Sequence, residues 1–216
     1  MYSVGVTARG GTRERLLKVS KSLFSARGYE HSSTSAIARQ AGTSESQLMK
    51  HFGSKAGLLE AIFADTWGKI TTEARTAMQG VASPRQRLEI ASSTVVKTME
   101  SDPELKLLML LEGRRIRREG QLIKLTPDFM SFVDLIDSVL DEMKAGGQIR
   151  SNLNTQAIRS ALMGTIEGMM RDRFLADRLG YPANFEAQQV EEMMELLLAS
   201  CGSTEFAVAS STAAPL

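Results

Sequence analysis

The chain has 216 residues, of which 43% are hydrophobic and 24% are charged. These values are ordinary for a soluble globular protein and exclude a disordered or fibrous chain. The longest tight apolar run, Leu107 to Leu111, is too short to cross a bilayer, and the first residues lack the apolar core of a signal peptide, so we expect a cytoplasmic protein with no membrane partner.

The net charge of +1 is divided unevenly along the chain. Residues 1–69 contain ten Lys or Arg and five Asp or Glu, which gives +5, and the remaining residues therefore carry −4. A basic segment joined to an acidic body is typical of a protein that meets a polyanion at one end. A surface exposed only to water would show the same imbalance, so charge alone leaves both interpretations open.

Residues that support catalysis or metal binding are scarce. The chain has two histidines, His31 and His51, and a single cysteine, Cys201, with no Cys/His metal spacing and no glycine-rich phosphate loop. Carboxylate pairs such as Glu191 and Glu192 are adjacent along a helix and do not face each other. We therefore expect no enzyme, no cofactor and no metal site.

Apolar residues recur at helical spacing through nearly the whole chain, and no run alternates as a strand would. The sequence predicts an all-α protein of about nine helices. The first helix is predicted to begin with Thr12 as its N-cap and to stop at Gly28, which suits a left-handed position after the helix. Tyr29 is then expected to fold back onto this helix.

Two short helices are predicted next. The first spans residues 36–41, with N-cap candidates at residues 32–34 and a stop at Gly42. Residues 44–47, Ser-Glu-Ser-Gln, form a capping box that begins the second, whose Leu48 points to the core.

A long fourth helix is predicted from Ser54 to about Met78, before a break at Ser83-Pro84. Further breaks divide the rest into about five more helices; they lie at Asp102-Pro103, Gly120, Thr126-Pro127, Gly146-Gly147, Gly180 to Pro182 and Gly202.

The two short helices around Gly42 are predicted to form a helix-turn-helix, whose second helix enters the major groove of DNA. Gln47 suits an adenine edge, Met49 a thymine methyl group, and Lys50 a guanine or a phosphate. His51 has two interpretations, a phosphate contact or packing at the helix end. The candidate DNA-binding residues are Ser33, Thr34, Ser44, Glu45, Ser46, Gln47, Met49, Lys50, His51 and Lys55.

The stretch LFSARGYEHSSTSAIARQAGTSESQLMKHFGSKAGLLEAIF, residues 23–63, resembles the N-terminal DNA-binding domain of the TetR (tetracycline-repressor-like) family. The rest of the chain agrees with that family only in length, helical content and layout. The resemblance implies that Gln47 and its neighbours read bases and that Thr34, His51 and Lys55 contact the DNA backbone. Met49 departs from the family, which usually has a tyrosine there, and a methionine cannot hydrogen-bond a phosphate.

This resemblance implies a ligand-responsive repressor that binds a palindromic DNA operator as a homodimer, with an unknown small-molecule effector. The predicted organisation is a flexible arm at 1–11, a helix-turn-helix domain at 12–53, a helical ligand-binding and dimerisation domain at 54–202, and a disordered tail at 203–216. A helical binding or scaffold protein with a non-functional helix-turn-helix is the alternative.

The last two long helices carry broad apolar stripes. A helix-turn-helix dimer needs a self-complementary surface, and the resemblance implies that these helices form a four-helix bundle with their copies. Packing within one chain is the alternative. The candidate interface residues are Ile158, Leu162, Gly164, Ile166, Gly168, Met169, Val190, Met193, Met194, Leu197 and Leu198.

An effector site is expected among the middle helices, where Met and aromatic residues suit an apolar ligand but also suit a plain core. Glu112 falls in an apolar register, where it meets a polar or cationic ligand group, sits at the edge of the stripe, or pairs with a nearby arginine of the cluster at residues 114–118. The candidate ligand residues are Trp67, Met99, Met109, Glu112, Phe129, Phe132 and Met163.

Overall fold

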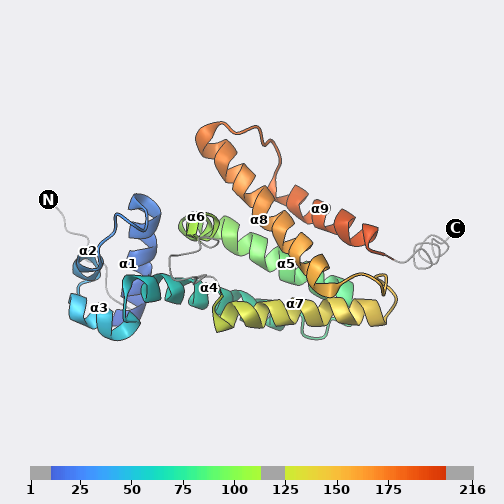
Figure 1. The fold of residues 1–216 in the computed structure, drawn as a ribbon, viewed down its shortest axis with the longest axis horizontal. Helices are drawn as coiled ribbons and strands as arrows, with labels where there is room; N and C mark the ends of the chain where they lie inside the picture. The colour runs from blue at the N-terminus through green and yellow to red at the C-terminus, as the bar shows by residue number, and fades with distance from the viewer. Residues whose placement is uncertain (1–10, 113–124, 203–216) are drawn as a thin grey trace. The chain divides into compact units, whose positions relative to one another are not determined.

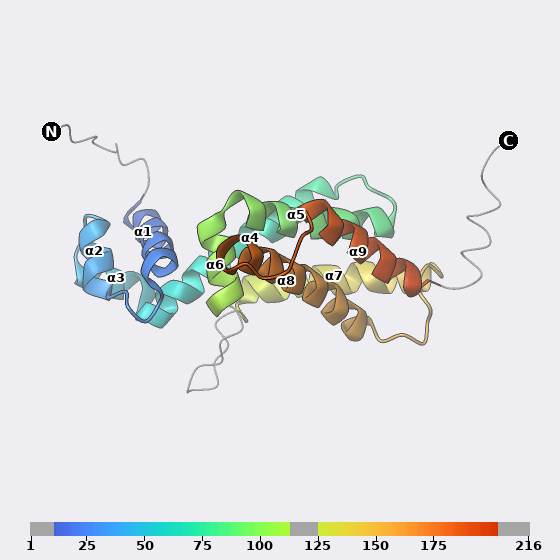
Figure 2. The same ribbon diagram turned by 90° about the horizontal axis from the view of Figure 1, so that it is seen from above.

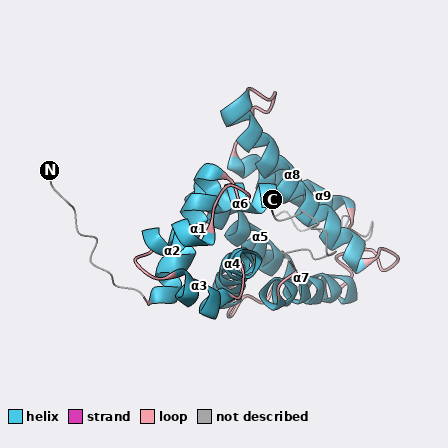
Figure 3. Ribbon diagram, turned by 60° about the vertical axis from the view of Figure 1, so that its left-hand side comes forward, coloured by secondary structure: helices cyan, strands magenta, loops and turns pink. Residues whose placement is uncertain are grey.

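The computed structural model describes residues 11–112 and 125–202, and every regular element in these two ranges is an α-helix (Figure 1, Figure 3). In chain order the helices are α1 (Thr12–Arg27), α2 (Thr34–Gln40), α3 (Glu45–Phe52), α4 (Lys55–Ala77), α5 (Pro84–Ser101), α6 (Pro103–Glu112), α7 (Pro127–Ala145), α8 (Thr155–Leu179) and α9 (Ala187–Ser200). The prediction of an all-α protein with about nine helices is confirmed over the described ranges.

Several predictions lie outside the described residues: residues 1–10 of the arm, the tail at 203–216, the break at Gly120, and the arginine partners proposed for Glu112, which are Arg114, Arg115, Arg117 and Arg118.

The contacts between residues divide the chain into two compact units. Unit 1 comprises residues 1–66 and 102–126, and unit 2 comprises residues 67–101 and 127–216. Helix α4 begins in unit 1 and continues into unit 2. The domain boundaries expected from sequence at residues 53 and 54 stay a prediction.

In unit 1, α1 packs against α2, α3 and α6 (Figure 1). Its apolar residues recur every three or four positions, so one face of the helix is apolar along its length. Tyr29 folds back as predicted, with its ring centroid 5.1 Å from that of Phe24. The side chains that fill this core with almost no exposure are Leu16, Phe24, Ile37, Leu48, Leu58, Leu59 and Leu108.

The ends of the first helices differ in detail from the sequence prediction. Gly11, not Thr12, is the N-cap of α1, and it makes no side-chain cap bond. Gly28 has the expected positive φ of 83°, but its ψ of 153° lies outside the left-handed helical region. Helix α2 begins two residues earlier than predicted, since Ser33 caps it by accepting from the Ala36 amide at 3.2 Å.

In unit 2, α5 packs against α7 and α9, and α8 packs against α7 and α9 (Figure 2). Trp67 of α4, Leu88 of α5 and Leu140 of α7 are almost completely buried and form part of its core. Among the described helices, none has an apolar stretch long enough to span a bilayer.

Candidate functional site

The turn between α2 and α3 is fixed by local hydrogen bonds. Gly42 adopts a φ of 67°, which a residue with a side chain rarely takes, and the Thr43 amide then donates to the Ala38 carbonyl oxygen at 3.0 Å. Ser44 caps α3 by accepting from the Gln47 amide at 3.2 Å. These contacts hold the two short helices in a helix-turn-helix.

Helix α3 has one buried side and one exposed side. Leu48 is completely buried against the rest of unit 1, and Phe52 is half-buried. The candidate residues on the other side all face solvent; they are Glu45, Ser46, Gln47, Met49, Lys50 and His51. Six adjacent exposed side chains on a short helix provide the surface that a major-groove contact requires.

Ser33 and Thr34, both expected at phosphates, also have partners inside the protein. The Ser33 hydroxyl accepts from the Ala36 amide, and the Thr34 hydroxyl donates to the Glu45 carboxylate. The second bond joins the first residue of α2 to the first residue of α3. Sequence reasoning placed both residues near DNA but missed this link between them.

Lys55, another expected phosphate contact, is half-buried at the start of α4. Its ammonium donates to the carbonyl oxygens of Tyr29 at 3.0 Å and Glu30 at 3.4 Å, and it lies 4.4 Å from the Tyr29 ring centroid. An ammonium over an aromatic face is attracted to the ring. Lys55 therefore ties the loop after α1 to α4, in addition to any contact with DNA.

The predicted dimer surface stays a prediction, and burial within a single chain divides its residues into two groups. Six of its residues are 7% exposed or less within a single chain; they are Ile158, Leu162, Ile166, Val190, Met194 and Leu198. Their own chain already covers most of their surface, so these six form part of the core of unit 2.

The remaining candidates keep accessible surface. Met193 is 46% exposed, and Gly164, Gly168, Met169 and Leu197 are half-buried. A Cβ atom added at either glycine would meet no other atom within 4 Å. Leu196 of α9 is 63% exposed, lies three residues after Met193, and was not among the predicted interface residues.

The expected ligand residues separate into groups. Trp67 lies with its ring centroid 4.9 Å from that of Phe129 and 5.1 Å from that of Phe132, so these three form an aromatic cluster in unit 2. Met99 is buried and Met163 half-buried in the same unit.

Two other expected ligand residues do not join this cluster. Met109 belongs to unit 1, where it is buried. Glu112 ends α6, and its side chain lies outside the described part of the structure.

Thr71, one turn after Trp67 on α4, carries an unusual buried hydroxyl. Thr66, Thr72 and Thr76 of the same helix each donate to the carbonyl oxygen four residues earlier, at 2.8 Å. The Thr71 hydroxyl is buried and makes no hydrogen bond within the described residues. Such a group costs about 1–3 kcal/mol unless a ligand or water satisfies it.

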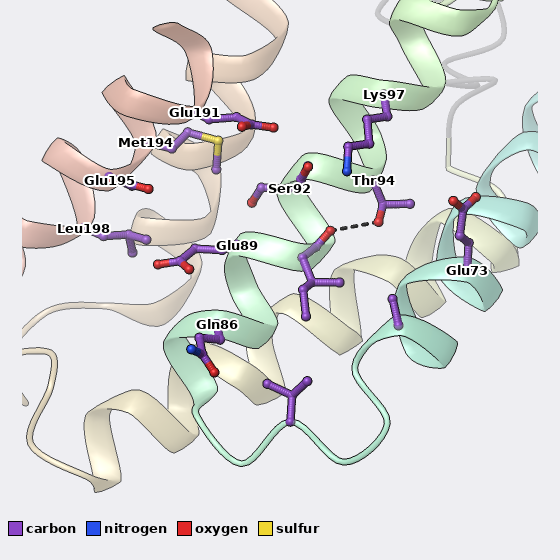
Figure 4. Close-up of a pocket in the computed structure, with 14 residues that line it drawn as sticks. Glu73, Gln86, Glu89, Ser92, Thr94, Lys97, Glu191, Met194, Glu195 and Leu198 are labelled. Atoms are coloured by element: carbon purple, nitrogen blue, oxygen red, sulfur yellow. Dashed lines mark hydrogen bonds between the residues drawn. The ribbon is translucent and has the colours of Figure 1, made fainter. Parts of the chain in front are cut away.

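A cavity of 590 Å³ opens elsewhere in unit 2, between the end of α4, α5 and α9 (Figure 4). None of the seven expected ligand residues lines it. Four glutamates and one lysine do, together with apolar side chains. The sequence showed the acidic residues only as helix surface, and the cavity itself depends on how the helices pack.

Comparison with known proteins identifies the family. The model of bacterial regulatory proteins of the tetR family matches residues 16–62, and that of the YsiA-like protein C-terminal region matches residues 63–200.

Two individual proteins with similar sequences are also regulators. The fatty acid metabolism regulator protein of Bacillus subtilis (strain 168) is 24% identical over 140 residues, covering 65% of this chain and 72% of that protein. The HTH-type transcriptional regulator UidR of Escherichia coli (strain K12) is 24% identical over 183 residues, covering 85% of this chain and 91% of that protein.

A solved structure of a transcriptional regulator has a similar fold. The crystal structure of the transcriptional regulator FadR from Bacillus subtilis in complex with stearoyl-CoA has a TM-score of 0.77 and 19% identity, and the match covers 88% of this chain and 99% of that one. The resemblance inferred from residues 23–63 is thereby confirmed. The chain belongs to the TetR family of bacterial regulatory proteins, and it is a DNA-binding transcriptional regulator with an N-terminal helix-turn-helix.

Proposed function

We propose that the protein is a homodimeric repressor that binds a palindromic operator through α3 and releases it when a small molecule binds in unit 2. The observation that carries this proposal is the exposed polar face of α3 over a completely buried Leu48. It acts in the cytoplasm, where its operator lies, and has no enzymatic activity.

The surface for a second copy combines two features of unit 2. Gly164 and Gly168 lie on the side of α8 away from its buried stripe, and two glycines cost an isolated helix about 1 kcal/mol each relative to alanine. Met193 and Leu196 of α9 are large apolar residues left in water. A close approach by the same helices of a second copy covers both features.

The effector class is suggested by the relatives. One relative is named for fatty acid metabolism, and a solved structure of similar fold holds stearoyl-CoA. We therefore propose a fatty acyl thioester as the effector, with its apolar chain near the Trp67, Phe129 and Phe132 cluster. The unsatisfied hydroxyl of Thr71 supports a polar ligand group one turn away on α4.

Fluorescence anisotropy of a labelled duplex tests DNA binding, and thermal melting of the protein tests effector binding. Random-sequence duplex DNA should bind with an affinity that falls steeply as salt rises, because Lys and Arg displace counterions from phosphates. Stearoyl-CoA should raise the melting temperature of the protein, and less so for Thr71→Val. A DNA affinity that does not change with salt concentration would favour the scaffold alternative. A melting temperature that stearoyl-CoA does not change would reject this effector class.

A further inference from the structure

The cavity between α4, α5 and α9 differs in chemistry from the aromatic cluster. We propose that it binds a small amphiphilic cation, an organic ammonium with an apolar chain, at a site distinct from the proposed acyl thioester site. At 590 Å³ it is within the usual range of ligand pockets, about 300–1,000 Å³.

The floor of the cavity is apolar. Ile90 of α5 and Met194 and Leu198 of α9 line it. The lining hydroxyls of Ser92 and Thr94 donate within α5 to the Leu88 and Ile90 carbonyl oxygens, at 2.9 Å and 2.8 Å, and are not available to a ligand as donors. An apolar chain therefore has Ile90, Met194 and Leu198 to pack against.

The rim of the cavity is acidic. Figure 4 shows Glu191 and Glu195 on the α9 side and Glu89 on α5. Glu89 pairs with Arg85, whereas Glu191 and Glu195 have no ion pair within the described residues. Those two are four residues apart on one helix, so their charges repel. A bound cation relieves this repulsion, while the phosphates of a coenzyme A thioester increase it.

The proposed dimer leaves the cavity open. Residues on an α-helix are about 100° apart, which places Glu191 and Glu195 on the side of α9 opposite Met193 and Leu196. A second copy that packs on Met193 and Leu196 therefore does not cover the acidic rim through α9.

Isothermal titration calorimetry at low ionic strength with octyltrimethylammonium and octanesulfonate tests the proposal, because these probes share a chain and differ in the sign of their charge. Octyltrimethylammonium should bind and octanesulfonate should not. Joint replacement Glu191→Gln and Glu195→Gln should weaken cation binding about fivefold, as expected for two partly exposed charge contacts. Lys97→Ala, which removes the lining cation, should strengthen it.

Asp177→Asn is the matched control, since it removes a carboxylate from an exposed position on α8 that does not line the cavity. It should leave cation binding unchanged. The double glutamine variant should melt no lower than the wild type, because a like-charge repulsion is lost. Equal binding of both probes, binding of neither, or unchanged affinity in the double variant would overturn the proposal.

Discussion

The ammonium of Lys55 lies 4.4 Å from the centroid of the Tyr29 ring and donates to the Tyr29 carbonyl oxygen at 3.0 Å. Lys55 begins the helix that follows α3, and Tyr29 follows α1. The contact therefore fixes the helix-turn-helix between two anchored segments, and it gives a predicted phosphate ligand a second role in stability.

Lys55→Ala should lower the free energy of unfolding by about 1 kcal/mol, from the lost hydrogen bond and cation–π contact. If Lys55 also contacts a phosphate, DNA affinity should fall for all sequences and the salt slope should decrease by about one unit. Lys50→Ala is the control, because Lys50 is exposed and should lose DNA affinity without loss of stability. Equal salt slopes for wild type and Lys55→Ala would reject the phosphate role.

Truncation of two neighbouring residues on α3 should change the unfolding free energy by very different amounts. Leu48→Ala should cost about 2–5 kcal/mol of unfolding free energy, because Leu48 is completely buried. Met49 is 42% exposed, so Met49→Ala should change stability by less than about 0.5 kcal/mol and alter base preference instead. Urea unfolding measures the first effect. Similar losses for both variants would mean that α3 is oriented differently.

Local signals made the helix-turn-helix predictable. Ser33 and Ser44 cap their helices, Gly42 supplies the positive φ between them, and each signal acts within four residues. The exposed face of α3 was predictable as well, because assigning Leu48 to the core places the other side of the helix in solvent.

The sequence did not predict which distant segments pack against each other. Apolar spacing correctly identified a buried stripe at Ile158 and Leu162, but spacing does not reveal whether a helix buries against its own chain or a copy. The contact of Lys55 with Tyr29 joins residues 26 positions apart. Met109, grouped with Trp67 by residue type, lies in the other unit.

Leu196→Glu should convert the dimer into a monomer, because it places a charge on a residue that is 63% exposed in one chain and covered in the proposed dimer. Sedimentation velocity measures the change. Met130→Glu, at a 43% exposed position on α7, is the control and should remain dimeric. A dimeric Leu196→Glu protein would place the interface elsewhere.

Stability should depend on pH through the carboxyl of Asp137 on α7, which forms an ion pair with Arg159 of α8. Burial raises the pKa of the Asp137 carboxyl, and the neighbouring Arg159 only partly opposes this. The stabilising contribution of the raised pKa is therefore complete below the unfolded-state value of about 3.9 and is lost as pH rises through the folded-state value.

The Asp137→Asn variant removes this titration. Its unfolding free energy relative to wild type should therefore shift in favour of the variant as pH rises above about 4. Denaturant unfolding at several pH values measures this, with Asp177→Asn as the control for the loss of one carboxylate. A difference that stays constant with pH would contradict the assignment.

Selection of bound sites from a random duplex pool tests the central claim most directly, with the wild type and Gln47→Ala compared in parallel. The wild type should enrich a palindrome, because two copies of α3 read half-sites related by dimer symmetry. Gln47→Ala should change the preferred base at one position in each half-site. Failure of the wild type to enrich any motif would contradict a DNA-reading role for α3.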